Sequence, residues 1–165
     1  MNEVTIEQKL RVLNDHIKGS AIPIKVVPLA RKLGINVFEV AWPDNVSGKI
    51  QRDEERGGDS GFAIYLNKAH PNTRKRFTLA HEIAHYILHE YEIGDGIFDD
   101  ALYRSGLSDK VEIEANNLAA DILMPRTELE NRISDGVDVP SLACQFEVSE
   151  QAMSIRLGKS FGLQT

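Results

Sequence analysis

The five-residue segment HEIAH, from His81 to His85, constrains this chain more than any other part of its sequence. It lies within residues 72–91, where the apolar residues recur at helical spacing. On a helix the two histidines lie one turn apart and about 40° apart around the axis, so both imidazoles can reach one metal ion. Glu82 projects about 60° to the side of His85, where a carboxylate can act as a general base without being a ligand. Two histidines stacked as ordinary core residues are the alternative interpretation.

A catalytic zinc site usually has three protein ligands and one position open to water, so a third ligand is needed. His89 follows His81 by eight residues, or about 12 Å along a helix, which is too far for both to bind one ion. We expect His89 to pack or to hydrogen-bond behind the site instead. A longer zinc pattern would need a third histidine at position 91, and Tyr91 stands there.

A second predicted helix, residues 111–123, offers two carboxylates as the third ligand. Glu112 lies beside two alanines on the apolar side, where small residues let another helix approach closely. Glu114 lies nearer the polar edge. We therefore favour Glu112 over Glu114, although the spacing leaves both open. Asn116, one turn after Glu112, is placed to orient a ligand by a hydrogen bond.

The remaining patterns predict an α+β fold. A capping box at Thr5 and Gln8 begins a helix that ends at Gly19. Predicted strands at residues 35–40, 47–52 and 61–66 are expected to form a small three-stranded antiparallel sheet against the HEIAH helix. Short helices are predicted at 27–33, 127–133, 141–146 and 149–159. A glycine- and aspartate-rich loop or lid is predicted at 92–110.

The predicted organisation is a core of residues 1–125, with its N-terminal helices, and a helical appendage of residues 126–165. Residues 141–158 have the spacing of a helix-turn-helix, which raises the alternative of a DNA-binding regulator. Residues 141–165 contain two basic and two acidic side chains, so the positive surface that phosphates require is missing. The net charge of −6 also argues against direct nucleic-acid binding.

The sequence also indicates the cellular compartment in which the protein is expected to function. No uncharged apolar run approaches the roughly 18 residues that a bilayer requires, so no membrane span is expected. The first ten residues lack a basic region followed by an apolar one, as a secretory signal would have. The single cysteine, Cys144, cannot form an internal disulfide, which suits a reducing compartment. These features favour a cytoplasmic protein.

Two segments carry a family resemblance: RFTLAHEIAHYILH (Arg76 to His89) and EIEANNLAADILMP (Glu112 to Pro125), with SGKI, AIYLN and NKAHP upstream. They resemble the ImmA/IrrE family of metallo-endopeptidases over roughly residues 22–125. The resemblance implies a gluzincin-like site in which His81 and His85 bind zinc, Glu82 is the catalytic acid/base, and the glutamate of the second segment is the third ligand. Asn116 stands where the similar gluzincin arrangement has an aspartate.

The resulting prediction is a zinc-dependent intracellular endopeptidase, with manganese as the alternative metal. The resemblance further implies cleavage of a helix-turn-helix repressor or a similar regulatory protein. A competing hypothesis is a non-proteolytic partner that binds a repressor or forms half of a toxin–antitoxin pair. Tyr103 and His89 are candidates for stabilising the oxyanion by chemical type alone. Arg74, on the histidine side of the helix, could meet an acidic residue of the substrate.

Overall fold

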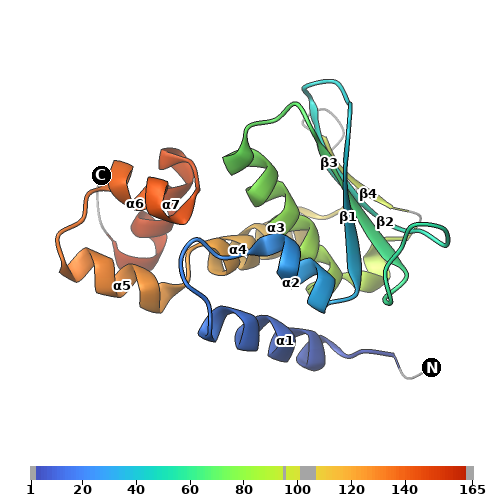
Figure 1. Cartoon of the computed structure of the whole chain (residues 1–165), viewed down its shortest axis with the longest axis horizontal. Coiled ribbons are helices and arrows are strands. Elements are labelled where there is room, and N and C mark those ends of the chain that lie inside the picture. The colour runs from blue at the N-terminus through green and yellow to red at the C-terminus, as the bar shows by residue number, and fades with distance from the viewer. Residues whose placement is uncertain (1–2, 95, 101–106, 163–165) are drawn as a thin grey trace.

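A mixed four-stranded sheet and seven α-helices make up the described part of the fold, an α+β arrangement (Figure 1). The structure is a computed structural model that describes residues 3–94, 96–100 and 107–162. The elements are α1 (Ile6–Lys18), α2 (Val26–Lys32), β1 (Ile35–Val40), β2 (Val46–Arg52), β3 (Phe62–Asn67), α3 (Asn72–Leu88), the 3-10 helix η1 (Glu90–Glu92), β4 (Ile97–Asp100), α4 (Asp109–Leu123), α5 (Arg126–Ser134), α6 (Val139–Phe146) and α7 (Glu150–Phe161).

Most of the predicted helices and strands are confirmed to within a few residues. The capping box of α1 is present, because Thr5 Oγ1 accepts the backbone N–H of Gln8 and Gln8 Oε1 accepts that of Thr5. Ser149 caps α7 in the same manner through the N–H of Ala152. The predicted helix 72–91 is shorter than expected, since α3 ends at Leu88 and one 3-10 turn follows.

The predicted three-stranded antiparallel sheet is wrong in strand number and in direction. The strand order is β1-β3-β2-β4, with β1 parallel to β3 and β2 antiparallel to both β3 and β4. Every residue of β3 is buried, so this strand takes a central position with neighbours on both edges and separates β1 from β2. β4 comes from the segment expected to be a loop or lid, of which residues 101–106 lie outside the described part.

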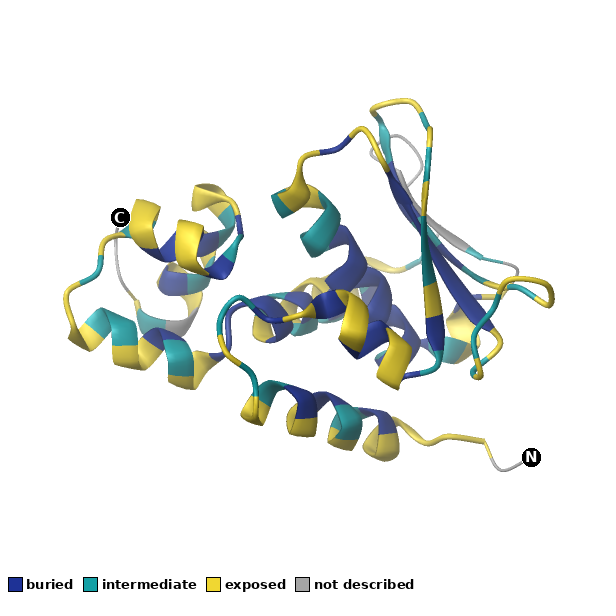
Figure 2. Cartoon of the chain, viewed as in Figure 1, coloured by how far each residue is buried: buried dark blue, intermediate teal, exposed yellow. Residues whose placement is uncertain are grey.

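The hydrophobic core joins the sheet, α3 and the C-terminal helices. Figure 2 shows that α3 is buried along most of its length, between the sheet on one side and the other helices. The cluster of buried apolar residues includes Ile64 of β3, Ile83 of α3, Leu129 of α5 and Phe146 of α6. A division of the chain near Pro125 stays a prediction. None of the helices in the described ranges is long and apolar enough to cross a bilayer.

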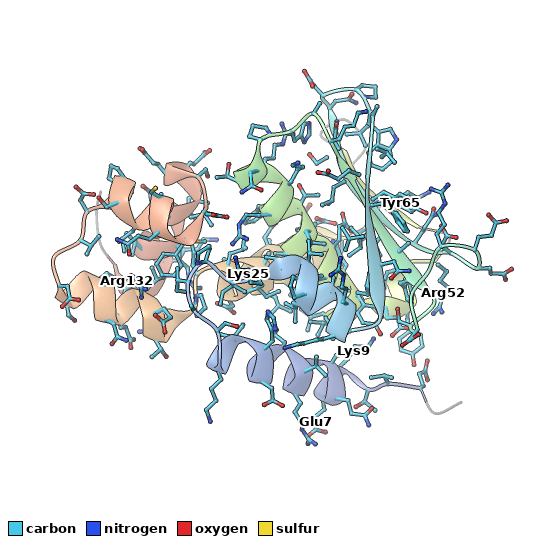
Figure 3. All side chains as sticks on the ribbon, viewed as in Figure 1. Glu7, Lys9, Lys25, Arg52, Tyr65 and Arg132 are labelled. Carbon is cyan, nitrogen blue, oxygen red and sulfur yellow. The ribbon has the colours of Figure 1, made fainter. Side chains whose placement is uncertain are left out.

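Two cations fix the ends of α3. Near its start, Arg76 donates to the backbone carbonyls of Ile24, Phe146 and Glu147. At its other end, Lys9 of α1 donates to the carbonyl of Tyr86 at 3.0 Å and pairs with Glu90. Lys9 is 2% exposed and points from α1 towards the rest of the molecule, whereas Glu7 points away (Figure 3).

Candidate metal centre

The middle of α3 presents the HEIAH segment on buried helix. Pro71 precedes the first turn, and neither proline nor glycine interrupts the seventeen residues that follow. His81 is 6% exposed, and Glu82 and His85 are 0% exposed. These side chains therefore lie at the buried side of α3, where α4 packs against it.

Three donor groups from α3 and α4 converge. The Nε2 atoms of His81 and His85 are 3.0 Å apart. Glu112 of α4 places Oε2 at 3.3 Å from His81 Nε2 and Oε1 at 3.4 Å from His85 Nε2. Around a tetrahedral ion with bonds of about 2.0–2.1 Å, neighbouring ligand atoms lie about 3.3 Å apart. The spacing of the three groups therefore fits a zinc-sized cation, and we call His81, His85 and Glu112 the metal cluster.

The structure brings together the two histidines and the favoured carboxylate. Among the described residues, His81, His85 and Glu112 are the group with metal-ligand chemistry whose donor atoms all lie within 4.8 Å of one another. Glu114 is not in this group, because its Oε2 atom lies 2.9 Å from His89 Nε2. The sequence did not decide between Glu112 and Glu114 as the third ligand, and the structure gives these two glutamates of α4 different neighbours.

Hydrogen bonds behind the metal cluster fix the orientation of both imidazoles. The Nδ1 atom of His81 lies 2.9 Å from Oδ1 of Asn116, an acceptor, so His81 donates there. Its Nε2 lone pair then faces the cluster. A ligand histidine held in this manner by an acceptor has a fixed tautomer and ring orientation.

His85 is held by a longer chain of side chains. Its Nδ1 atom lies 3.2 Å from Nδ1 of His89, and His89 Nε2 lies 2.9 Å from Oε2 of Glu114. An ionised carboxylate only accepts, so His89 donates to it from Nε2, and its Nδ1 atom can accept the proton of His85. His85 Nε2 is then available to a metal. Both nitrogens of His89 are engaged with neighbours, so His89 lies behind the metal cluster, as expected.

The charges of the metal cluster suit a divalent cation. The adjacent imidazoles of His81 and His85 hold the pKa of the Glu112 carboxyl well below its usual value, so this group is ionised. Burial lowers the pKa of His85, which favours the neutral imidazole. Two neutral imidazoles and one carboxylate form a donor set that zinc commonly binds in enzymes.

Glu82 and Tyr103 were also predicted to take part in the site. Glu82 follows His81 on α3 and is fully buried, and its role as a base stays a prediction. Tyr103, the other oxyanion candidate, lies outside the described residues. The contact of Glu114 with His89 was not predicted, because it joins two helices and leaves no local signal in the sequence.

A groove of about 790 Å³ opens between α3, α4 and α7. Asn116, the partner of His81, lines it, as do Arg74 and Phe77 of α3. Arg74, which the sequence placed on the histidine side of the helix, lines this groove. The contribution of α7 to this groove was not predicted, because the spacing of one helix does not say which element it packs against.

Comparisons with known proteins show similarity in sequence family and in fold. The Peptidase M78 family model, described as the IrrE N-terminal-like domain, matches residues 30–158. A Mycobacterium tuberculosis transcriptional regulator of known structure is similar in fold, with a TM-score of 0.60 and 17% sequence identity. The similarity covers 91% of this chain and 46% of that one, so the chain spans about half the length of the regulator. Curated protein sequences gave no match.

Proposed function

The chain belongs to the Peptidase M78 (IrrE N-terminal-like) family, and from this premise we propose that it is a metal-dependent endopeptidase. The observation that carries the proposal is the convergence of His81, His85 and Glu112, whose donor atoms are spaced 3.0 to 3.4 Å apart, on a helix in which buried Glu82 follows His81. These four residues supply a ligand set and a base, which together are the protein's part in metal-assisted hydrolysis.

The metal cluster would hold zinc, with manganese as the alternative. Two imidazoles and a carboxylate favour zinc, since manganese prefers oxygen ligands. When bound, the ion supplies Lewis acidity, which activates a water molecule and polarises the scissile carbonyl. Asn116 and the His89–Glu114 pair keep both imidazoles turned towards the ion.

Glu82 acts as the proton carrier of the reaction. Its carboxylate accepts a proton from the attacking water as the oxygen bonds to the carbonyl carbon. It then delivers that proton to the amide nitrogen, which leaves as an amine when the C–N bond breaks. The residue is fully buried, so bulk water competes little for this transfer.

A regulatory protein of the cytoplasm, in particular a helix-turn-helix repressor, is the proposed substrate. The support is the family resemblance of the two motif segments, together with a fold shared with a protein described as a transcriptional regulator. The fold alone does not identify a substrate. Residues 141–158 are proposed to contact protein in preference to DNA, since the last 25 residues carry as many acidic as basic side chains.

Glu82→Gln tests the peptidase proposal directly. The zinc-loaded wild-type protein should cleave a repressor that is expressed with it. The Glu82→Gln variant should retain zinc, measured by elemental analysis, and lose cleavage. Cleavage by the variant at the wild-type rate would overturn the mechanism. Full suppression of the repressor by the uncleaving variant would instead favour the non-proteolytic partner.

A further inference from the structure

The groove between α3, α4 and α7 borders the surroundings of the metal cluster at Asn116. Phe77 precedes His81 by four residues and Arg74 precedes it by seven, about 6 and 10 Å along the same face of α3. On α4, Asn116 both lines the groove and contacts His81. A peptide chain lying in the groove is therefore separated from His81 by one side chain, Asn116.

The groove has an apolar floor that is open to solvent. Its apolar lining comes from three helices and the turn before α7: Phe77, Ala120, Met124, Val148, Ala152 and Ile155. Ile155 is 51% exposed, unusually open for a large aliphatic residue. Concave apolar surface of this kind is typical of ligand sites, whose volumes range from about 300 to 1,000 Å³.

The rim of the groove is positive, although the chain as a whole carries a charge of −6. Three cations line the groove, Arg74, Arg156 and Lys159, against the one carboxylate of Asp121. Asp121 pairs with Arg156 at 2.7 Å, so these two charges offset each other. Arg74 donates to the hydroxyl of Ser47, which leaves its charge in place, and Lys159 is exposed. Two positive charges remain for an occupant.

We propose that the groove binds a segment of the protein substrate in which apolar side chains are flanked by aspartate or glutamate. The assignment of this segment to a substrate rests on the proposed peptidase function. Its apolar side chains cover Ile155 and the floor, and its carboxylates pair with Arg74 and Lys159. Nucleic acid fits the groove less well, because phosphates call for denser positive charge and gain nothing from an apolar floor.

Peptide binding to the zinc-loaded Glu82→Gln protein tests the proposal without cleavage. The probes are three pools of short fluorescent peptides: apolar residues with Asp and Glu, the same apolar residues with Lys, and Asp and Glu with serine in place of the apolar residues. Fluorescence anisotropy should give the first pool an affinity at least about tenfold above each of the others. Raising the salt concentration should weaken this binding.

Variants of the groove locate the binding site. Ile155→Asp should weaken binding of the first pool by about tenfold or more, since it removes an apolar contact and repels carboxylates. Ile6→Asp is the matched control, because Ile6 is 48% exposed on α1 and outside the groove, and it should leave binding unchanged. Arg74→Ala and Lys159→Ala should each weaken binding severalfold and reduce its salt dependence.

Several outcomes would overturn the proposal. Equal binding of the acidic and lysine pools would show that the groove does not select acidic side chains. Wild-type affinity in Ile155→Asp would show that the peptides bind somewhere other than the groove. A dimer in sedimentation velocity that Ile155→Asp dissociates would assign the groove to a second copy. Binding of labelled duplex DNA that depends on Ile155 would assign it to nucleic acid.

The groove proposal and the peptidase proposal can be tested independently of each other. If wild-type protein hydrolyses unfolded casein but Glu82→Gln binds none of the pools, the groove proposal is wrong and the peptidase proposal stands. If the acidic apolar pool binds as expected but zinc-loaded wild-type protein hydrolyses neither the peptides nor casein, the groove proposal stands and the peptidase proposal is wrong.

Discussion

Asn116 accepts a hydrogen bond from His81 across 2.9 Å, from a position one turn beyond Glu112 on α4. One helix therefore supplies both a candidate ligand and the group that orients another ligand. Asn116→Ala should weaken zinc affinity about 10- to 100-fold, because the imidazole of His81 loses its fixed orientation. Competition with a chelator measures the affinity.

Asn116→Asp is the informative companion variant, since an ionised acceptor makes a stronger hydrogen bond to the imidazole. It should bind zinc at least as tightly as the wild-type protein. An Asn116→Ala variant with wild-type zinc affinity would show that the hydrogen bond to His81 does not matter for metal binding.

Glu112 and Glu114 should differ sharply when each is replaced by alanine. Glu112→Ala removes a candidate ligand and should leave the purified protein without stoichiometric zinc. Glu114→Ala removes the partner of His89, together with an exposed pair with Lys110, and should lower zinc affinity by about 10- to 100-fold or less. Elemental analysis after dialysis against a fixed zinc buffer compares the two. Loss of zinc in Glu114→Ala with retention in Glu112→Ala would reverse the assignment of the third ligand.

The Lys9–Glu90 pair should matter for stability. Lys9 is buried against the carbonyl and the ring of Tyr86, so Glu90→Gln leaves its ammonium charge without the neutralising carboxylate. Loss of one partner of a buried pair costs about 3–5 kcal/mol, measured by urea denaturation. As a control, Glu130→Gln removes an exposed pair with Arg126 and should change stability by less than about 1 kcal/mol. Similar effects of the two substitutions would contradict the importance of burial.

The stability of the folded protein should depend on pH through the carboxyl group of Asp53. The hydroxyl of Tyr65 donates to its carboxylate at 2.5 Å, and with further hydrogen bonds this lowers the pKa of Asp53 from 3.8 to about 2. Because the folded-state pKa is the lower one, the contribution of Asp53 to stability is present above about pH 4. It is lost as the pH falls through about 2.

The Asp53→Asn variant should therefore show a weaker decline of Tm between pH 4 and 2 than the wild-type protein. Thermal unfolding in a series of acidic buffers measures that decline. An unchanged slope would mean that the hydrogen bond from Tyr65 does not favour the ionised carboxylate of Asp53.

The site was predictable where its signals are local. The two histidines and Glu82 follow from helical spacing, and the small residues beside Glu112 indicated the inward face of α4. The distance between His81 and His89 along a helix placed His89 outside the predicted ligand set, and in the structure His89 contacts Glu114. None of this required knowledge of how distant segments pack.

The remaining features depend on packing between distant segments. The sheet order follows from complete burial of β3, which periodicity alone did not reveal, and the four residues of β4 are too few to show a pattern. The contact of His89 with Glu114 and the placement of α7 beside Arg74 both join elements far apart in the chain. Such relationships are set by tertiary structure and leave no periodic trace.

Arg76 and Lys9 hold α3 near its start and at its end, independently of any bound ion. The scaffold of both histidines is thus assembled by contacts outside the metal cluster. We therefore expect preorganisation: a chelator should strip the cation while the far-ultraviolet circular dichroism stays unchanged. Returning the cation should restore activity on the timescale of mixing, because no refolding step intervenes.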